Sequence, residues 1–157
     1  MKPERTLVLL KPDALERCLA GRLIATFEER GLKIVGLKML RMTDGLLERH
    51  YEKLAEEKFF PRLRKFMKST PVVAMALEGL DAVAVVRDMA GETNAREARR
   101  GTIRGALAMS RQCNLVHASE QVSDAMRELE LFFTPGEIFS YPRKLDCVLY
   151  SEEERDK

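Results

Sequence analysis

The chain has 157 residues, of which 45% are hydrophobic and 33% are charged, and its formal net charge at pH 7 is +2. This length predicts one globular domain, residues 1–157, with a core that needs no disulfide or structural metal. The small net charge gives no reason to expect an acidic partner such as nucleic acid. Three isolated cysteines, Cys18, Cys113 and Cys147, form neither a paired framework nor a CxxC motif, and we interpret them as buried or incidental thiols in a reducing compartment.

The first half of the chain alternates short apolar runs with helical patterns. Residues 6–10 predict a buried strand, because they are short, apolar and β-leaning. Apolar side chains recur at helical spacing over residues 19–30, and a second strand follows at residues 32–40. Helical patterns then occupy residues 43–54 and 59–67. The expected caps of these helices are Asp13 and Thr43 at N-termini and Gly31 at a C-terminus.

The second half repeats this order around one long polar segment. Residues 71–79 predict a third strand and residues 82–89 a short helix. The segment Gly91–Gly105 is rich in Gly, Thr and Arg without an apolar period, and we interpret it mainly as a functional loop. Residues 113–118 predict the fourth strand, and Ser119 can cap a last helix whose apolar positions are Val122, Ala125, Met126 and Leu129. The tail SEEERDK is expected to be solvated and frayed.

The order of these elements predicts the fold class. It fits an α+β sandwich, in which a four-stranded antiparallel sheet carries helices packed on one face. Ferredoxin-like βαββαβ topology is one natural solution. The N-terminal apolar run, Leu7 to Leu10, is too short for a signal peptide, and no stretch reaches the ~20 apolar residues of a membrane span. We therefore expect a cytoplasmic protein without a membrane partner.

His117 is the first candidate for chemistry. It lies between a predicted strand and a predicted helix N-terminus, where free N–H groups favour phosphate. A neutral imidazole there can act as a nucleophile if a carboxylate holds its other ring nitrogen. Chain distance alone leaves Glu128 and Glu130 as alternatives for that carboxylate, and on spacing alone a structural histidine remains the more ordinary interpretation. The other histidine, His50, is interpreted as a surface or half-buried helix residue.

Basic residues before His117 give a second indication of phosphate. Arginine forks match phosphate oxygens, and threonine hydroxyls add donors. The five arginines in question are Arg87, Arg96, Arg99, Arg100 and Arg104, with Thr93 and Thr102 among them. Lys11, at the end of the first strand, could point into the same cleft. A solvated charged loop and a solvated lysine are the alternatives, and the familiar GxxxxGK[ST], GxGxxG and HExxH signatures are absent from the sequence.

Several motifs together resemble the nucleoside diphosphate kinase family. NLVHASE, residues 114–120, is similar to that family's NxxH(G/A)S(D/E) segment. ERTLVLLKPDALER, HYEKLAEEKFFP, PVVAMALEG, GETN, GTIRG and LFFTPGEI follow the family's order and spacing. The resemblance covers about residues 4–140 and leaves residues 141–157 as a C-terminal extension. It implies phosphate transfer from a nucleoside triphosphate, typically ATP, to a nucleoside diphosphate by a ping-pong mechanism through phosphohistidine.

The resemblance assigns roles by position. His117 becomes the phosphorylated nucleophile, Glu128 the carboxylate that holds its ring, and Ser119 the hydroxyl that bonds this carboxylate. Lys11 and Tyr51 are expected near the transferred phosphate, and Phe59 stacks on the base. The remaining nucleotide contacts are Arg87, Thr93, Arg104 and Asn114. Mg²⁺ is expected on the substrate phosphates, with Glu120 reaching it through water at most. The family is oligomeric, so a homo-hexamer or homo-tetramer is expected, without a dedicated nucleic-acid site.

The sequence departs from the family pattern at a few positions. Ala95 and Arg100 replace prolines of the loop, and Ala106 replaces an aspartate after GTIRG. Arg111 stands where a small apolar residue commonly touches the base. The remaining departures are Ala118 and Glu120, in place of Gly and Asp beside the histidine. Without the two prolines the loop backbone has more conformational freedom. Taken together, these departures are expected to affect loop rigidity, base affinity and oligomeric state.

Two other functions use the same residues. A non-catalytic nucleotide or nucleic-acid binding module would use the basic loop, but RNA-recognition sheets stack bases on strand aromatics and the predicted strands have none. A relay that passes phosphate from histidine to a protein would need only His117 and an acceptor surface, which makes the full set of nucleotide contacts redundant.

Overall fold

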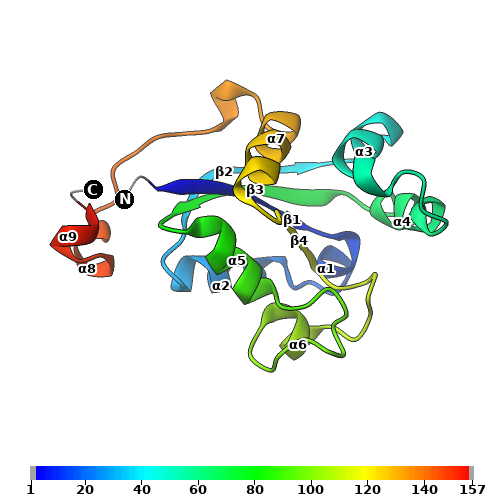
Figure 1. Ribbon diagram of the computed structural model, residues 1–157, viewed down its shortest axis with the longest axis horizontal. Helices are drawn as coiled ribbons and strands as arrows, with labels where there is room; N and C mark the ends of the chain where they lie inside the picture. Colours follow the sequence, from blue (N-terminus) through cyan, green and yellow to red (C-terminus); the bar gives the residue numbers. More distant parts are fainter. Residues whose placement is uncertain (1–2, 156–157) are drawn as a thin grey trace.

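A four-stranded antiparallel sheet forms the centre of the molecule in the computed structural model, which describes residues 3–155 (Figure 1). The strands are β1 (Glu4–Leu10), β2 (Lys33–Leu40), β3 (Val72–Gly79) and β4 (Val116–Ala118). The strand order is β2-β3-β1-β4, so β1 pairs with both β3 and β4. This is the predicted βαββαβ topology, and the predicted α+β fold class is confirmed.

Successive side chains of β1 are buried on both faces of the sheet. Successive side chains of a strand point to opposite faces, and Leu7 to Leu10 are all fully buried. Val8 and Leu10 belong to one core cluster, whereas Leu7 and Leu9 belong to another. Hydrophobic burial on two faces of a single strand therefore fixes β1, and the residue that follows it, at the centre of the fold.

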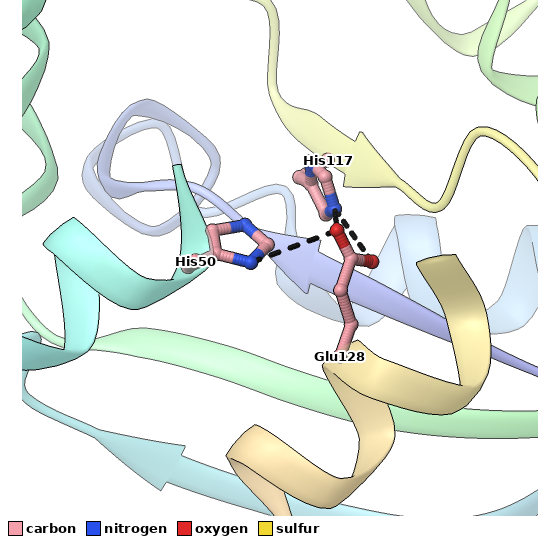
Figure 2. A group of neighbouring side chains, drawn as sticks. All are labelled: His50, His117 and Glu128. Carbon is pink, nitrogen blue, oxygen red and sulfur yellow. Dashed lines mark hydrogen bonds and ion pairs between the residues drawn. The ribbon is translucent and has the colours of Figure 1, made fainter. Parts of the chain in front are cut away.

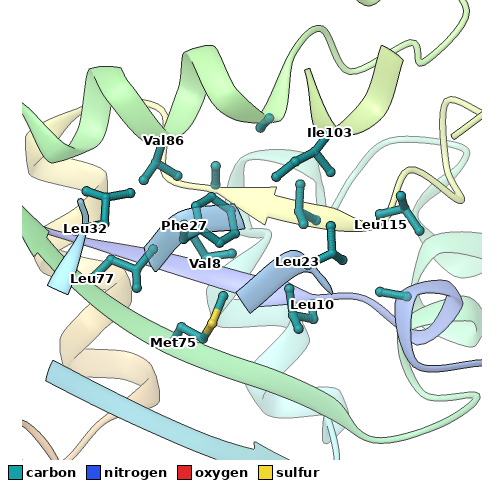
Figure 3. Close-up of a cluster of buried hydrophobic side chains, with 14 of the residues drawn as sticks. Val8, Leu10, Leu23, Phe27, Leu32, Met75, Leu77, Val86, Ile103 and Leu115 are labelled. Atoms are coloured by element: carbon teal, nitrogen blue, oxygen red, sulfur yellow. The ribbon is translucent and has the colours of Figure 1, made fainter. Parts of the chain in front are cut away.

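The helices divide between the two faces (Figure 1). Those on the first core are α2 (Ala20–Glu29), α5 (Ala82–Ala90) and α6 (Ile103–Leu107), which contribute Phe27, Val86 and Ile103 among others (Figure 3). Those on the second core are α3 (Asp44–His50), α4 (Phe60–Met67) and α7 (Val122–Phe132). The two crossover helices, α2 and α5, share one face as expected. The additional helices α3, α4 and α7 cover the opposite face, which the expectation of helices on one face did not include.

Several shorter elements complete the described chain. They are α1 (Pro12–Glu16), η1 (Glu52–Leu54), η2 (Pro135–Glu137), α8 (Asp146–Leu149) and α9 (Glu152–Arg155). The segment beyond residue 140 is anchored beside β2, because Tyr141 Oη donates to the Ile34 carbonyl (2.6 Å) and Arg143 to that of Gly31 (2.9 Å). The expected frayed tail instead forms the turn of α9, and its last two residues, 156 and 157, lie outside the described part.

Local expectations were met at some helix ends and wrong at others. Thr43 caps α3 by accepting a hydrogen bond from the Leu46 amide (3.2 Å), and Gly31 follows α2 with a φ of 94°. Asp13 does not cap α1, because it lies inside the helix and accepts from the Leu115 amide instead. The α7 cap position is Gln121 rather than Ser119, whose hydroxyl is used elsewhere.

Three further expectations need correction. The last strand spans only Val116–Ala118, and GTIRG contributes the start of α6 rather than loop alone. On α7, the side chains of Val122 and Met126 are exposed, while Ala125 and Leu129 are buried as predicted. The three cysteines are free and exposed, so of the two interpretations, buried or incidental thiols, the first is wrong and the second stays open. In the described part of the chain, no helix combines the length and apolar character that a membrane crossing requires.

Candidate active site

A pocket of about 880 Å³ collects nearly all of the predicted site residues. It lies between the carboxyl end of β1, the β4 strand and the helices α3 and α7. The lining residues to which the family resemblance assigned a role are Lys11, Tyr51, Phe59, Arg87, Thr93, Arg104, Asn114, His117, Glu120 and Glu128. Ser119 is fully buried behind the pocket wall. Residues more than 100 positions apart in the chain therefore meet at one cavity.

His117 and Glu128 both line the pocket, and their side chains point toward each other (Figure 2). His117 lies on β4 opposite Leu9 of β1, and its Nε2 is 3.1 Å and 3.0 Å from the two Glu128 carboxylate oxygens. Glu128 is buried, whereas Glu130 is exposed, so Glu128 is the carboxylate that holds the ring. With Nε2 as the donor, the lone pair of Nδ1 is free to attack a phosphorus atom.

Ser119 fixes the orientation of the Glu128 carboxylate. Its hydroxyl donates to Glu128 Oε2 at 2.6 Å, a short charge-assisted hydrogen bond. The same hydroxyl accepts from the Leu7 amide of β1 at 3.4 Å. Burial raises the pKa of the Glu128 carboxyl, but hydrogen bonds from His117 and Ser119 and the nearby imidazoles together hold that pKa below its ordinary value. Glu128 is therefore an anion that can stabilise positive charge on the His117 ring.

His50 is part of this cluster, which corrects its interpretation as a surface or half-buried residue. It is buried, with its ring centroid 4.4 Å from that of His117, and its Nδ1 is 3.6 Å from Glu128 Oε1 (Figure 2). Burial, reinforced by His117, lowers the pKa of His50 well below its usual value. His50 follows Leu47 by three residues on α3, so the helical period alone could have placed it on the buried face.

Lys11 is held by a polar network directly after β1. Its Nζ donates to the Gln112 carbonyl (2.8 Å) and to Asn114 Oδ1 (2.7 Å). The Asn114 amide nitrogen donates in turn to the carbonyls of Thr93 (2.8 Å) and Arg111 (2.9 Å). Burial lowers the pKa of Lys11 to about 8, with the Arg104 charge acting in the same direction and Asp13 opposing it. An anionic ligand in the pocket would favour the charged form.

One residue beside the Lys11–Asn114 network, Leu115, has a left-handed backbone conformation. Leu115 has a φ of 71°, a conformation that costs a non-glycine residue about 1–2 kcal/mol. Two hydrogen bonds hold it: the Lys11 amide donates to its carbonyl (2.8 Å), and its amide donates to Asp13 Oδ2 (3.0 Å). The KPD turn therefore supports the backbone between Asn114 and His117. This role of Asp13 was missed, because the residue reads locally as a helix cap.

The arginine cluster divides into pocket residues and loop residues. Arg104 donates to the carbonyls of Gly91 (2.6 Å) and Val116 (2.8 Å), and burial together with the neighbouring Arg87 charge lowers its pKa to about 10. Arg96 also lines the pocket. Arg99 instead pairs with Asp88 at 2.8 Å, outside the pocket. The wholly solvated alternative is therefore wrong for Arg104 and fits Arg99.

A helical hairpin forms the outer wall of the pocket. Tyr51 directly follows α3 and Phe59 directly precedes α4, and both line the pocket, where the Phe59 side chain is exposed. Lys53 donates to Asp124 of α7 at 2.9 Å and ties the hairpin to that helix. Burial raises the pKa of the Tyr51 hydroxyl above its usual value, with the Glu128 charge adding to the effect, so this hydroxyl stays protonated and can donate.

Not every sequence expectation is supported here. The lining residues at the start of α7 are the acids Glu120 and Asp124, so a phosphate site at this helix N-terminus gains no support. Arg111, the departure at the expected base position, does line the cavity. The loop positions Ala95 and Arg100 differ: the Ala95 side chain is buried in the first core, and Arg100 is exposed. Ala106 is exposed as well.

Comparisons with known proteins show which family the chain belongs to. The family model described as "Nucleoside diphosphate kinase" matches residues 4–138. The nucleoside diphosphate kinase of Rhodopirellula baltica is 47% identical over 151 residues, 96% of this chain and 99% of its own. Among solved structures, the Halobacterium salinarum nucleoside diphosphate kinase in complex with CDP has a TM-score of 0.92 and 39% identity, covering 94% of this chain and 99% of its own. The Borrelia burgdorferi enzyme, a transition state mimic with vanadate and ADP, has a TM-score of 0.87 and 34% identity, covering 93% and 96%.

Proposed function

This chain belongs to the nucleoside diphosphate kinase family, and we propose that its pocket transfers the terminal phosphate of a nucleoside triphosphate to a nucleoside diphosphate through phosphohistidine at His117. The observation that carries the site assignment is the His117–Glu128–Ser119 chain of hydrogen bonds at the centre of a cavity rich in cations. Such a chain presents one ring nitrogen as a nucleophile and stabilises charge on the other.

The first half-reaction follows from the protonation of the ring. His117 Nδ1 attacks the terminal phosphorus, the new N–P bond forms as the bridging P–O bond breaks, and the nucleoside diphosphate leaves. The ring, still protonated at Nε2, becomes cationic, and the Glu128 carboxylate stabilises it. In the second half-reaction, a terminal oxygen of another diphosphate attacks the phosphorus, the new P–O bond forms as the N–P bond breaks, and His117 returns to its neutral form. One site used twice in this way gives ping-pong kinetics.

Cations that line the same pocket would neutralise the transferred phosphate. Lys11, Arg87 and Arg104 line the cavity with His117, and a loose phosphoryl transition state is catalysed mainly by positioning and charge. Tyr51 would donate a hydrogen bond to the same group. Mg²⁺ fits best as part of the substrate, because the phosphate side is cationic and Glu120 is the exposed carboxylate near His117. Bound to the phosphates, Mg²⁺ would supply further charge neutralisation.

The nucleoside is proposed to lie toward the outer wall. Phe59 is an exposed aromatic residue of the pocket lining, and stacking tolerates every base. The roles of Thr93, as a phosphate contact, and Asn114, as a sugar contact, remain proposals. Asn114 is already engaged by Lys11, so a sugar hydroxyl would join an existing network.

Self-association is also proposed. The edge strand β2 exposes Leu37 (50%) and Met39 (62%), an apolar surface that association would bury. Light scattering coupled to size-exclusion chromatography would distinguish a monomer from a tetramer or hexamer. Three exposed free cysteines support a reducing, cytoplasmic location, which we keep as a proposal.

Phosphoenzyme formation tests the proposed function. Incubation with γ-labelled ATP and Mg²⁺ should give an acid-labile, base-stable adduct on wild-type protein and none on folded His117→Ala. A chase with each diphosphate should remove the label and return the matching triphosphate. The absence of label on folded wild-type protein would contradict the proposal.

A further inference from the structure

We propose that His50, His117 and Glu128 together form a binding site for Zn²⁺ or a similar borderline divalent cation, and that an ion bound there blocks phosphorylation of His117. The three side chains come from three different elements, α3, β4 and α7, and converge on one point (Figure 2). One potential ligand atom from each lies within 4.8 Å of the other two. This site differs from Mg²⁺ carried by substrate phosphates, because two of its three ligands are imidazoles.

The distances fit a small tetrahedral ion. Zn²⁺ bonds to nitrogen and oxygen at about 2.0–2.1 Å, which places neighbouring tetrahedral ligands about 3.3 Å apart. His117 Nε2 and His50 Nδ1 lie 3.1 Å and 3.6 Å from the same carboxylate oxygen, Glu128 Oε1. Both distances to the carboxylate are close to this value, and the two imidazole nitrogens, within 4.8 Å of each other, would move together to complete three ligand bonds. Three protein ligands leave the fourth position to water or a substrate oxygen.

His50 supplies an independent indication of a ligand. Both of its ring nitrogens are buried without a hydrogen-bond partner among residues 3–155, although buried polar groups are normally satisfied. Burial lowers its pKa well below the usual value, so the ring is neutral and its lone pair is available to a metal at pH 7. Glu128 contributes the negative charge, and its pKa is held below the ordinary value.

The inhibitory consequence rests on the proposed function and follows from the proton positions on His117. The reactive ring carries its proton on Nε2 and its lone pair on Nδ1. A metal at Nε2 binds a lone pair on Nε2 itself, so the single proton of the neutral ring must move from Nε2 to Nδ1. The ring charge is unchanged, but the nucleophilic lone pair is lost. Mg²⁺ prefers six oxygen ligands and does not compete for two imidazoles.

Binding is tested first without nucleotide, so that its outcome is separate from catalysis. Equilibrium dialysis with Zn²⁺ should give one ion per chain, both in wild-type protein and after Cys18→Ser, Cys113→Ser and Cys147→Ser remove the exposed thiols. His50→Gln should weaken binding by at least about tenfold, since loss of even a supporting partner of a metal ligand costs 10–100-fold. Glu130→Gln is the matched control on α7 and should bind as wild type does.

Inhibition is then measured as the rate of phosphohistidine formation at buffered Zn²⁺ with excess Mg²⁺. Zinc should slow labelling of wild-type protein, EDTA should restore it, and His50→Gln should need at least about tenfold more Zn²⁺ relative to its own zinc-free rate. If His50→Gln does not fold, nitrogen NMR of wild-type protein serves instead, because the chain has two histidines and zinc should shift one ring nitrogen of each. Binding that disappears with the cysteines, or equal zinc sensitivity of wild type and His50→Gln, would overturn the proposal. Normal labelling without zinc would leave the proposed function intact in either case.

Discussion

The two sides of the pocket are built differently. On the sheet side, His117, Glu128 and Ser119 are buried or half-buried and bonded to one another and to β1. On the outer side, Phe59, Thr93 and Arg111 are exposed and come from a hairpin and loops. A preorganised group costs no reorganisation during the reaction, whereas an exposed wall can adapt to different nucleotides. We therefore expect changes on the sheet side to lower kcat and changes on the outer side to raise KM.

The largest effect is expected for Glu128→Gln. The amide keeps the shape of the side chain but loses the charge that stabilises the His117 ring, and it can bond the wrong tautomer. The phosphorylation rate should fall about 10²–10³-fold, the cost of removing one preorganised electrostatic group. Stopped-flow or quench-flow labelling measures this rate. Glu130→Gln, on the exposed side of the same helix, should retain the wild-type rate, and an equal loss in both variants would contradict the division.

Phe59→Ala tests the outer side. Removing the stacking face should raise the KM for diphosphates about tenfold or more, since stacking contributes about 1–3 kcal/mol per base. The kcat should change much less, because Phe59 takes no part in the hydrogen bonds that join His117, Glu128 and Ser119. Steady-state kinetics with several diphosphates separate the two parameters. Phe139→Ala, another exposed phenylalanine outside the pocket, is the matched control; a fall in kcat without a rise in KM would break the comparison.

The pH dependence of Lys11 links the two sides. Its pKa is lowered to about 8, so kcat/KM should fall by up to about tenfold per pH unit above 8 as the ammonium loses its proton. Folding should respond in the opposite direction. Because the folded chain releases this proton below the ordinary pKa of 10.5, the Lys11 contribution to stability rises between pH 8 and pH 10.5. Lys11→Arg should move the alkaline limb of the rate profile upward; an unmoved limb would assign it to another group.

The smallest effect is expected in the loop Gly91–Gly105, which contributes Thr93 to the outer side. Arg100→Pro restores a residue typical of the family where the chain is exposed, and no hydrogen bond from the Arg100 amide is seen in the described part. If the backbone accepts proline, the free energy of unfolding should rise by about 0.4–1 kcal/mol. Thermal unfolding measures this change. A fall in stability would mean that the loop conformation here differs from the one that proline favours.

The sequence predicted the fold well where local pattern and burial agree, as in the apolar run of β1. It was less reliable on α7, where the buried stripe is Asp124, Ala125, Glu128, Leu129 and Phe132. Because two of these buried residues are acids, the apolar residues alone do not show the helical period of the buried face. The exposed apolar residues Val122 and Met126 indicate a different face. For this reason chain distance left Glu128 and Glu130 open, although the spacing of Ala125, Leu129 and Phe132 would have favoured Glu128.

Other site residues depend on tertiary contacts that no local pattern encodes. Asp13 supports Leu115, which is 102 positions away, and the positive φ of Leu115 explains why the fourth strand begins only at Val116. The family resemblance supplied the positions of the pocket residues, but not these supports. His50 lies between the two cases, because its period on α3 indicated burial while its partners came from β4 and α7.

The central position of β1 has a consequence for how the molecule opens. Lys11 directly follows this strand, and Leu9 of β1 is paired with His117 of the neighbouring strand β4. Amide protons in such a doubly covered strand exchange with solvent only when the whole structure opens. Fraying of the chain ends or of the outer loops can therefore change nucleotide capture while the nucleophile keeps its place. The catalytic pair should be lost only in the same cooperative event that unfolds the domain.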